Sequence, residues 1–191
     1  MVISIGMKTL VLYMSSSGST KKYAEEIAAS VKADILPSKK FKRKMIANYD
    51  TIVFGGWVLG GKIKGIDEFL TLWDDMKDKN VIVFSVGMSI PTKEARADMI
   101  SGNLLDMYHL RYYMLRGSFD YQKLKFPYKF LFANSLRLIE RDENATADQK
   151  ALLEVKERPI LVHDEEGINK VISIINRLAA MPIDAEVIDK K

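Results

Sequence analysis

One continuous stretch, residues 11–27, constrains the fold more than any other, because it joins a strand, a tight turn and the start of a helix. Residues 8–14 form an apolar run with β-branched and aromatic members, which is typical of a strand buried on both faces. The turn at 15–20 holds four serines, one glycine and one threonine. From Thr20 to Val31, apolar residues recur at helical spacing. This stretch therefore predicts a βα unit with a hydroxyl-rich turn.

The hydroxyl-rich turn predicts a phosphate site. Free backbone N–H groups point out of a helix N-terminus, and the helix dipole favours negative charge there. Gly18 allows close backbone approach to a ligand. An ordinary capped helix is the plainer explanation, but five hydroxyls exceed what a cap requires. The turn lacks both the Gly-Lys-Ser/Thr ending of a Walker A loop and the three glycines of a dinucleotide fingerprint, so a phosphate monoester fits best.

The same residues resemble the FMN-phosphate signature of the flavodoxin family. The match runs Val11-Leu12-Tyr13-x-Ser15-x-x-Gly18-x-Thr20-x-x-x-Ala24-x-x-Ile27. The resemblance implies that the phosphate of FMN is bound by Ser15, Ser16, Ser17, Gly18, Ser19 and Thr20. It also implies the α/β fold of a flavodoxin-like three-layer sandwich. That fold has a five-stranded parallel sheet in the order 2-1-3-4-5 and helices on both faces, here with an extra helical segment after strand 5.

Strands and helices alternate along the rest of the chain, which independently predicts a parallel sheet covered on both faces. Further strands are expected at 33–36, 49–57, 80–86 and 110–117. Helices are expected at 66–76, 92–107 and 167–180, with a short helix or turn at 41–48. No repeat or linker divides the sequence. Residues 1–191 are therefore expected to form a single flavodoxin-like domain with a basic, aromatic insertion at about 119–150.

In a sheet of this order, ligands bind beyond the carboxyl ends of the strands, at the switch point between strands 1 and 3. The loops after strands 1, 3 and 4 should therefore border one cleft. Trp57 and Leu59 offer apolar surface for a flat ring. Trp57 could instead be a core residue of strand 3, and this alternative stays open. Its position at the end of the strand favours contact with the ring. The residues expected to frame the isoalloxazine ring are Gly56, Trp57, Val58, Leu59, Gly60, Gly61, Gly87, Met88 and Ser89.

The loop after strand 4 departs from the family pattern. Flavodoxins often carry a Tyr there that stacks on the flavin, but residues 87–90 include no aromatic side chain. One face of the ring would then be less covered, or covered by another segment. A response-regulator receiver is excluded. That family needs an Asp at the end of strand 3 and an acidic pair after strand 1, but the corresponding residues here, 55–57 and 14–16, contain no carboxylate. No metal is expected, since His109 and His163 lie far apart and cysteine is absent.

Composition and charge limit the cellular location and the partners that can be expected. At 48% hydrophobic residues, with no apolar run of about eighteen, the chain is typical of a globular protein without a membrane span. Residues 1–7 lack the features of a secretory signal, so a cytoplasmic location is expected. The formal net charge is +4, whereas flavodoxin carriers are usually acidic. The basic clusters at 39–44 and 109–141 suit acidic partners, anionic lipid or nucleic acid. A solvated face is favoured for the first cluster, and nucleic acid is not an expected partner.

A minimal flavodoxin lacks the segment that follows strand 5. Pro127 suits the first turn of a helix. The helical face is expected to consist of Tyr128, Leu131, Phe132, Ser135 and Leu138, with Ile139 beside it. Such a basic amphipathic helix either packs on its own domain or uses 121–141 to contact an anionic membrane or an apolar partner. In placement and composition it resembles the insertion of the flavodoxin-like, menaquinone-dependent protoporphyrinogen oxidases.

Three functions follow as hypotheses. The flavodoxin resemblance implies an FMN-binding electron-transfer protein that works with a redox partner protein or a small-molecule electron donor or acceptor. The insertion favours an alternative, a flavin-dependent oxidase of protoporphyrinogen type that passes electrons to a quinone and sits peripherally at the membrane. The third hypothesis is a flavin-free interaction module of the same fold. No side chain is identified as catalytic, so whether the protein is a carrier or an enzyme stays open.

Overall fold

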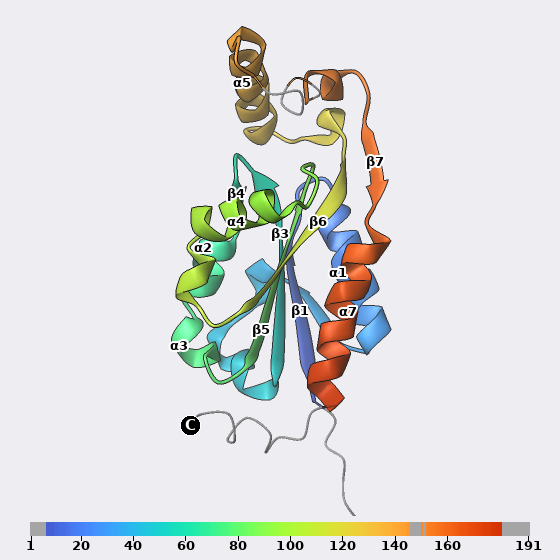
Figure 1. The fold of residues 1–191 in the computed structure, drawn as a ribbon. Coiled ribbons are helices and arrows are strands. Elements are labelled where there is room, and N and C mark those ends of the chain that lie inside the picture. The colour runs from blue at the N-terminus through green and yellow to red at the C-terminus, as the bar shows by residue number, and fades with distance from the viewer. Residues whose placement is uncertain (1–6, 146–149, 151, 181–191) are drawn as a thin grey trace, which may run out of the picture.

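The centre of the computed structural model, which describes residues 7–145, 150 and 152–180, is a twisted parallel sheet (Figure 1). Its parallel strands are β1 (Thr9–Met14), β2 (Asp34–Pro37), β3 (Thr51–Leu59), β5 (Asn80–Gly87) and β6 (Arg111–Phe119). They lie in the order β2-β1-β3-β5-β6, which confirms the expected order 2-1-3-4-5. Residues 1–6 and 146–149, the latter at the end of the expected insertion, lie outside the described residues.

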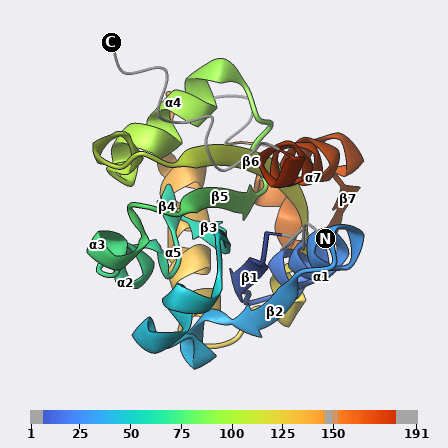
Figure 2. The ribbon, with the colours of Figure 1, turned by 90° about the horizontal axis from the view of Figure 1, so that it is seen from below.

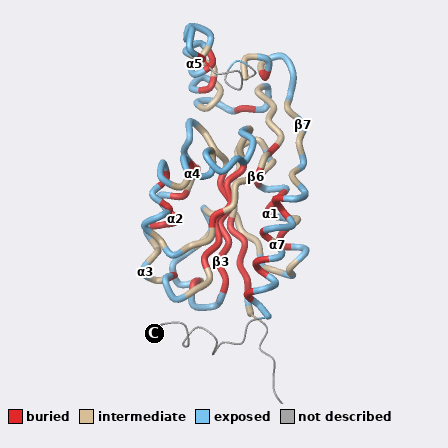
Figure 3. The backbone as a smooth tube through the Cα atoms, in the orientation of Figure 1, coloured by how far each residue is buried: buried red, intermediate tan, exposed pale blue. Residues whose placement is uncertain are grey.

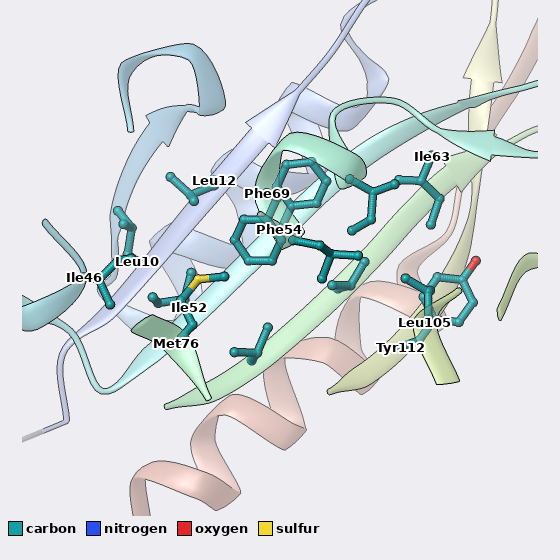
Figure 4. Close-up of a cluster of buried hydrophobic side chains, with 14 of the residues drawn as sticks. Leu10, Leu12, Ile46, Ile52, Phe54, Ile63, Phe69, Met76, Leu105 and Tyr112 are labelled. Atoms are coloured by element: carbon teal, nitrogen blue, oxygen red, sulfur yellow. The ribbon is translucent and has the colours of Figure 1, made fainter. Parts of the chain in front are cut away.

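Helices cover both faces of this sheet (Figure 2). One face carries α1 (Ser19–Val31) and α7 (Glu165–Ala180), and the other carries α2 (Ile66–Leu70), α3 (Trp73–Met76) and α4 (Lys93–Gly102). Because successive side chains of a strand point to opposite faces of the sheet, β1 contributes residues to two hydrophobic cores. Its Leu10 and Leu12 pack with Phe54 and Phe69 on the α2 side (Figure 4), whereas its Val11 packs on the α1 side.

The five expected parallel strands are all present, but the sheet has two further, antiparallel strands that were not expected. β4 (Lys62–Ile63) pairs antiparallel with the end of β3. Gly60 and Gly61 form the turn with φ of 58° and 75°, and adjacent positive φ values favour a tight hairpin. β7 (Ile160–His163) pairs antiparallel with β6. This strand is too short for its alternation of buried and exposed side chains to be recognised in the sequence. β7 pairs with β6 only between Gly117 and Phe119, so the first part of β6 is an open edge among the described residues.

Two expected helices end early. The helix expected at 66–76 divides into α2 and α3, and the Thr71 hydroxyl at the break donates to the Glu68 carbonyl (2.7 Å), a local bond that competes with the helical pattern. The helix expected at 92–107 begins as predicted, with the Thr92 hydroxyl accepting from the Ala95 N–H (3.1 Å), but it ends at Gly102. Leu104 then has a φ of 54°, which a helix does not permit.

Residues 120–159, called the insertion below, leave β6 at the carboxyl edge of the sheet and return through β7 (Figure 1). The insertion contains α5 (Tyr128–Arg141) between 3₁₀ turns at Tyr121–Lys123 and Leu152–Lys156. The expected face of α5 is correct at Phe132, which is buried, but wrong at Leu131 and Leu138. Leu131 and Leu138 are 47% and 70% exposed, because the helix packs through a narrower stripe of Phe132 and Leu136. None of the described helices combines the length and apolar character needed to cross a membrane.

Candidate functional site

A cavity of about 440 Å³ opens at the carboxyl edge of the sheet and brings the three expected loops together. The expected site residues that line it are Ser16, Ser17, Ser19, Thr20, Trp57, Val58, Leu59, Gly60, Gly61, Gly87, Met88 and Ser89. Ser15, Gly18 and Gly56 are not among the residues that line it. The cavity lies where β1 and β3 end side by side, which is the switch point of a doubly wound sheet.

The N-terminus of α1 at this cavity is not capped by a side chain. The cap residue is Gly18, with a φ of 105°, and its N–H donates to the Ser15 hydroxyl (3.2 Å). The N–H groups of Ser19, Thr20 and Lys21 have no hydrogen-bond acceptor within the described part of the chain. The serine-rich turn is therefore not an ordinary cap, and it leaves the donors of the first helical turn available to an anion.

The hydroxyls of the turn divide into two groups. Ser19 Oγ donates to the Ser118 carbonyl (2.7 Å) and so ties the turn to β6. Ser16 and Ser17 are half-buried, and Thr20 is 1% exposed; all three line the cavity, and their hydroxyls make no hydrogen bond to another described residue. Within the described chain, Asp98 is the single charged residue of the lining. An anion here would be held by neutral donors and the helix end.

The end of β3 supplies an aromatic wall. Trp57 is half-buried, belongs to neither core of the sheet and meets Tyr128 of α5 edge-on, with 4.9 Å between ring centroids. Gly56 was expected to let a ligand approach, but it serves the hairpin instead. A Cβ there would lie 2.5 Å from Ile63 Cγ2 and 2.8 Å from the Lys64 carbonyl oxygen.

Sequence reasoning missed Asn103, which holds the hairpin in place. This residue is 5% exposed and lies just after α4. Its side-chain oxygen accepts from the Ile63 N–H (2.8 Å), and its amide nitrogen donates to the Gly61 carbonyl (3.0 Å) and the Met99 carbonyl (2.8 Å). Nothing in the sequence distinguishes this Asn from an ordinary residue after a helix, because its partners in the hairpin lie about forty positions away.

The insertion completes the cavity on the side of Met88. Its contributions to the lining are Leu124, Phe132, Ser135, Leu136, Ile139 and Leu152. Met88 and Leu59 pack against the buried cluster of Leu124, Phe132 and Leu136. Of the two alternatives for the loop that lacks an aromatic residue, the structure supports the second, in which another segment forms that wall.

The titratable groups offer little acid–base chemistry to the cavity. Tyr112 lies in the sheet core, where its hydroxyl is 2.6 Å from Ser85 Oγ and burial raises its pKa to about 12. His163 packs edge-on against Tyr23 and lies 3.5 Å from the Glu26 carboxylate, outside the cavity. The described residues contain no group of three His, Cys, Asp or Glu side chains that could hold a metal. The cavity therefore combines unpaired backbone donors of the first turn of α1 at one end with an apolar cleft at the other.

The sheet order and the cavity at its switch point define a doubly wound α/β protein of the mononucleotide-binding type. A family model described as the flavodoxin domain matches residues 10–147, and the chain belongs to that family. None of the curated proteins matches it.

Among solved structures, a flavodoxin from the domain Archaea is 21% identical, with a TM-score of 0.43, over 58% of this chain and 85% of that one. The flavodoxin of Megasphaera elsdenii is 18% identical, with a TM-score of 0.44, over 56% and 84% of the two chains. An NADH:FMN oxidoreductase in its apo form is 11% identical, with a TM-score of 0.47, over 88% and 89%. All three are distant, so the family assignment rests on the family model.

Proposed function

We propose that this protein binds FMN in the cavity at the carboxyl edge and transfers electrons between a donor and an acceptor. The observation that carries the proposal is the uncapped N-terminus of α1, which faces the same cavity as the apolar ends of β3 and β5. Bound FMN would supply the redox chemistry, and the chain would hold and shield it. The absence of a dinucleotide fingerprint in the turn favours FMN over FAD.

Each end of the cavity has a distinct role in this proposal. The free N–H groups of the first turn of α1 and the Thr20 hydroxyl would donate to the phosphate. Trp57 and Leu59 would contact one region of the ring, and Met88 and Phe132 would exclude water from another. A redox partner protein or a small electron donor or acceptor would then meet the exposed part of the flavin.

Flavin identification and one matched pair of variants test this proposal. Heat-released flavin should elute as FMN, and a dominant FAD peak would contradict the assignment. Thr20→Val removes a donor at the phosphate end and should weaken FMN about tenfold while leaving riboflavin binding almost unchanged. Ser19→Ala is the control, because that hydroxyl already donates to Ser118. Equal loss of FMN and riboflavin in Thr20→Val would show that the turn is only structural. Absence of any flavin binding would support the flavin-free interaction module.

We propose as a second candidate that the protein is a flavin enzyme for a large apolar substrate, such as a porphyrinogen with a quinone acceptor, working at an anionic membrane surface. Two observations favour it. The insertion adds an apolar wall beside the flavin cavity. The insertion also exposes Phe126 and Leu138, at 83% and 70%, near Lys123, Lys125 and Arg137 in the sequence. Exposed aromatics with basic neighbours suit the interface of an anionic membrane.

Removal of the insertion separates the carrier from the enzyme. Because Phe119 and Ile160 are paired neighbours, an Asn-Gly turn can replace residues 120–159 and close β6 and β7 as a hairpin. The shortened protein should retain FMN but lose binding to phosphatidylglycerol vesicles and turnover with porphyrinogen and quinone. A milder variant, Phe126→Ser with Leu138→Ser, should lose only the vesicle binding. If the intact protein shows neither vesicle binding nor turnover, the plain carrier is supported.

A further inference from the structure

A second cavity of about 570 Å³ lies on the outer side of β6, away from the flavin cavity. Its floor is formed by residues 110–114, and its walls come from α4 on one side and α7 on the other. Figures 1 and 2 both show β6 passing between these two helices. This is the open part of the β6 edge, which β7 does not cover. Among the residues that the structure describes, Met114 is the one that lines both cavities.

Among the described residues, the lining of this cavity carries cations and no carboxylate. The cationic side chains are Arg96 of α4, Arg111 of β6, and Lys170 and Arg177 of α7. Lys170 is paired with Glu166 on its own helix (2.6 Å). Arg111 and Arg177 form no ion pair with any carboxylate in the described ranges. Positive charges from three separate elements therefore meet in one hollow, and within the described part of the chain two of them, Arg111 and Arg177, have no paired carboxylate.

Arg96 is held in place at this cavity. Its Nη2 donates to the Tyr112 carbonyl (3.0 Å), and its guanidinium carbon lies 5.8 Å from the centroid of the Tyr112 ring. This contact fixes the direction of the other guanidinium nitrogens, which have no hydrogen-bond partner among the described residues. A fixed guanidinium loses less conformational freedom on binding than a mobile one, and its planar fork matches phosphate and carboxylate oxygens.

We propose that the cavity between α4 and α7 binds a small polyanion that carries two or more phosphate or carboxylate groups. A concave site lined by one sign of charge concentrates oppositely charged ligands, and a hollow of this size fits a small molecule. The charges stand on opposite walls and on the floor, so a ligand with several anionic groups can reach more than one of them. The proposal does not depend on the cofactor of the first cavity.

Titration of the protein with tripolyphosphate and, separately, citrate tests the proposal. Saturating FMN occupies any phosphate site in the first cavity, and a salt concentration of about 0.15 M screens weak surface attraction. Binding is measured by calorimetry, and the backbone amide resonances that shift locate it. The expected result is binding of at least one polyanion, with shifts at residues 111–114. The double variant Arg111→Gln/Arg177→Gln should weaken it about tenfold or more.

The control variant is Lys39→Gln/Lys42→Gln, which removes the same charge from an exposed cluster outside the cavity. It should leave polyanion binding within about twofold of the unchanged protein, since general charge attraction is screened at this salt concentration. Equal loss in the two double variants would overturn the proposal in favour of net charge alone. Absence of binding, or shifts confined to residues 16–20, would also overturn it. Binding of an acidic peptide but of neither polyanion would assign the edge to a protein partner instead.

Discussion

The sheet core and the insertion form opposite walls of the cavity proposed to bind FMN, but they are held together very differently. In the sheet, large side chains such as Leu12, Phe54 and Phe84 are completely buried between helices on both faces. In the insertion, the buried cluster consists of Leu124, Phe132 and Leu136, while Phe126 and Phe130 are 83% and 58% exposed. Figure 3 shows the contrast as a buried sheet below a largely exposed insertion.

This difference indicates which wall moves. Segments with few buried apolar contacts open locally at a lower free energy than core strands do. The phosphate end of the cavity, built on β1 and α1, should therefore stay formed while the insertion opens and closes beside Met88 and Leu59. Ligand entry would then be controlled by the insertion, and affinity for the phosphate by the sheet.

The strongest test compares two leucines that are both 0% exposed. Leu12→Ala creates a cavity in the sheet core and should lower the free energy of unfolding by about 3–4 kcal/mol. Leu136→Ala should lower it by less than about 1 kcal/mol, because the insertion contributes only its own small cluster. Urea unfolding measures the first effect, and amide exchange in α5 should report the second. Equal global losses would show that the two regions fold as one unit.

The next largest effect is expected where α4 supports the hairpin after β3. Asn103→Ala removes three hydrogen bonds and leaves the Ile63 N–H and the Gly61 carbonyl without their partner. The free energy of unfolding should fall by about 2 kcal/mol, and FMN should bind more weakly because Gly60 and Gly61 line the cavity. Ser101→Ala, whose hydroxyl contacts only its own helix, is the control. Unchanged exchange of the hairpin amides in Asn103→Ala would contradict this role.

An alkaline titration tests the burial of Tyr112 in the sheet core. Burial raises the pKa of Tyr112 from 10.0 to about 12, so the folded state keeps a proton that the unfolded state releases between those values. The stabilisation is complete below pH 10 and is lost as the pH rises through about 12. Tyr112→Phe should flatten this decline, although it also loses the Ser85 contact, worth about 1 kcal/mol at neutral pH. An unchanged slope would mean that another group causes the alkaline loss.

The smallest effect is expected at the contact between the two walls. Trp57 meets Tyr128 edge-on, and Lys64 Nζ lies 6.0 Å from the same Tyr128 ring. A double-mutant cycle with Trp57→Leu and Tyr128→Leu should give a coupling energy of about 1 kcal/mol, measured in flavin-free protein by amide exchange in α5. Zero coupling would show that the insertion rests on the sheet without this contact.

The elements that could be predicted from the sequence are those whose signals lie close together in the chain. The βα unit at 11–27 was predicted from a long apolar run and a long motif. The order of the five parallel strands was implied by the family resemblance that this motif carries, and the structure confirms that order. The convergence of the three loops then followed from strand order, because carboxyl ends of parallel strands share one edge. Whether the predicted residues bind a flavin stays a prediction for the variants above.

The features that were missed depend on contacts between distant residues. The stripe of α5 that packs was misassigned, since Leu131 and Leu136 are equally apolar and only the position of Leu59 and Met88 selects between them. Strand β7 forms because its partner is β6, and its return is secured by the Tyr23 hydroxyl, which accepts from the Asp164 N–H (2.9 Å). Asn103 likewise acquires its role from a hairpin far away in the sequence.

The open edge of β6 also bears on how copies of this protein behave in concentrated solution. An uncovered strand invites another chain to pair with it, which is a route to self-association and aggregation. Here the edge is flanked by Arg96 and Arg111, and the Arg96 guanidinium already donates a hydrogen bond to the Tyr112 carbonyl. Two copies that approach through this edge would bring like charges together. The arginines should therefore oppose self-association by electrostatic repulsion. High salt screens this repulsion and should favour self-association through β6.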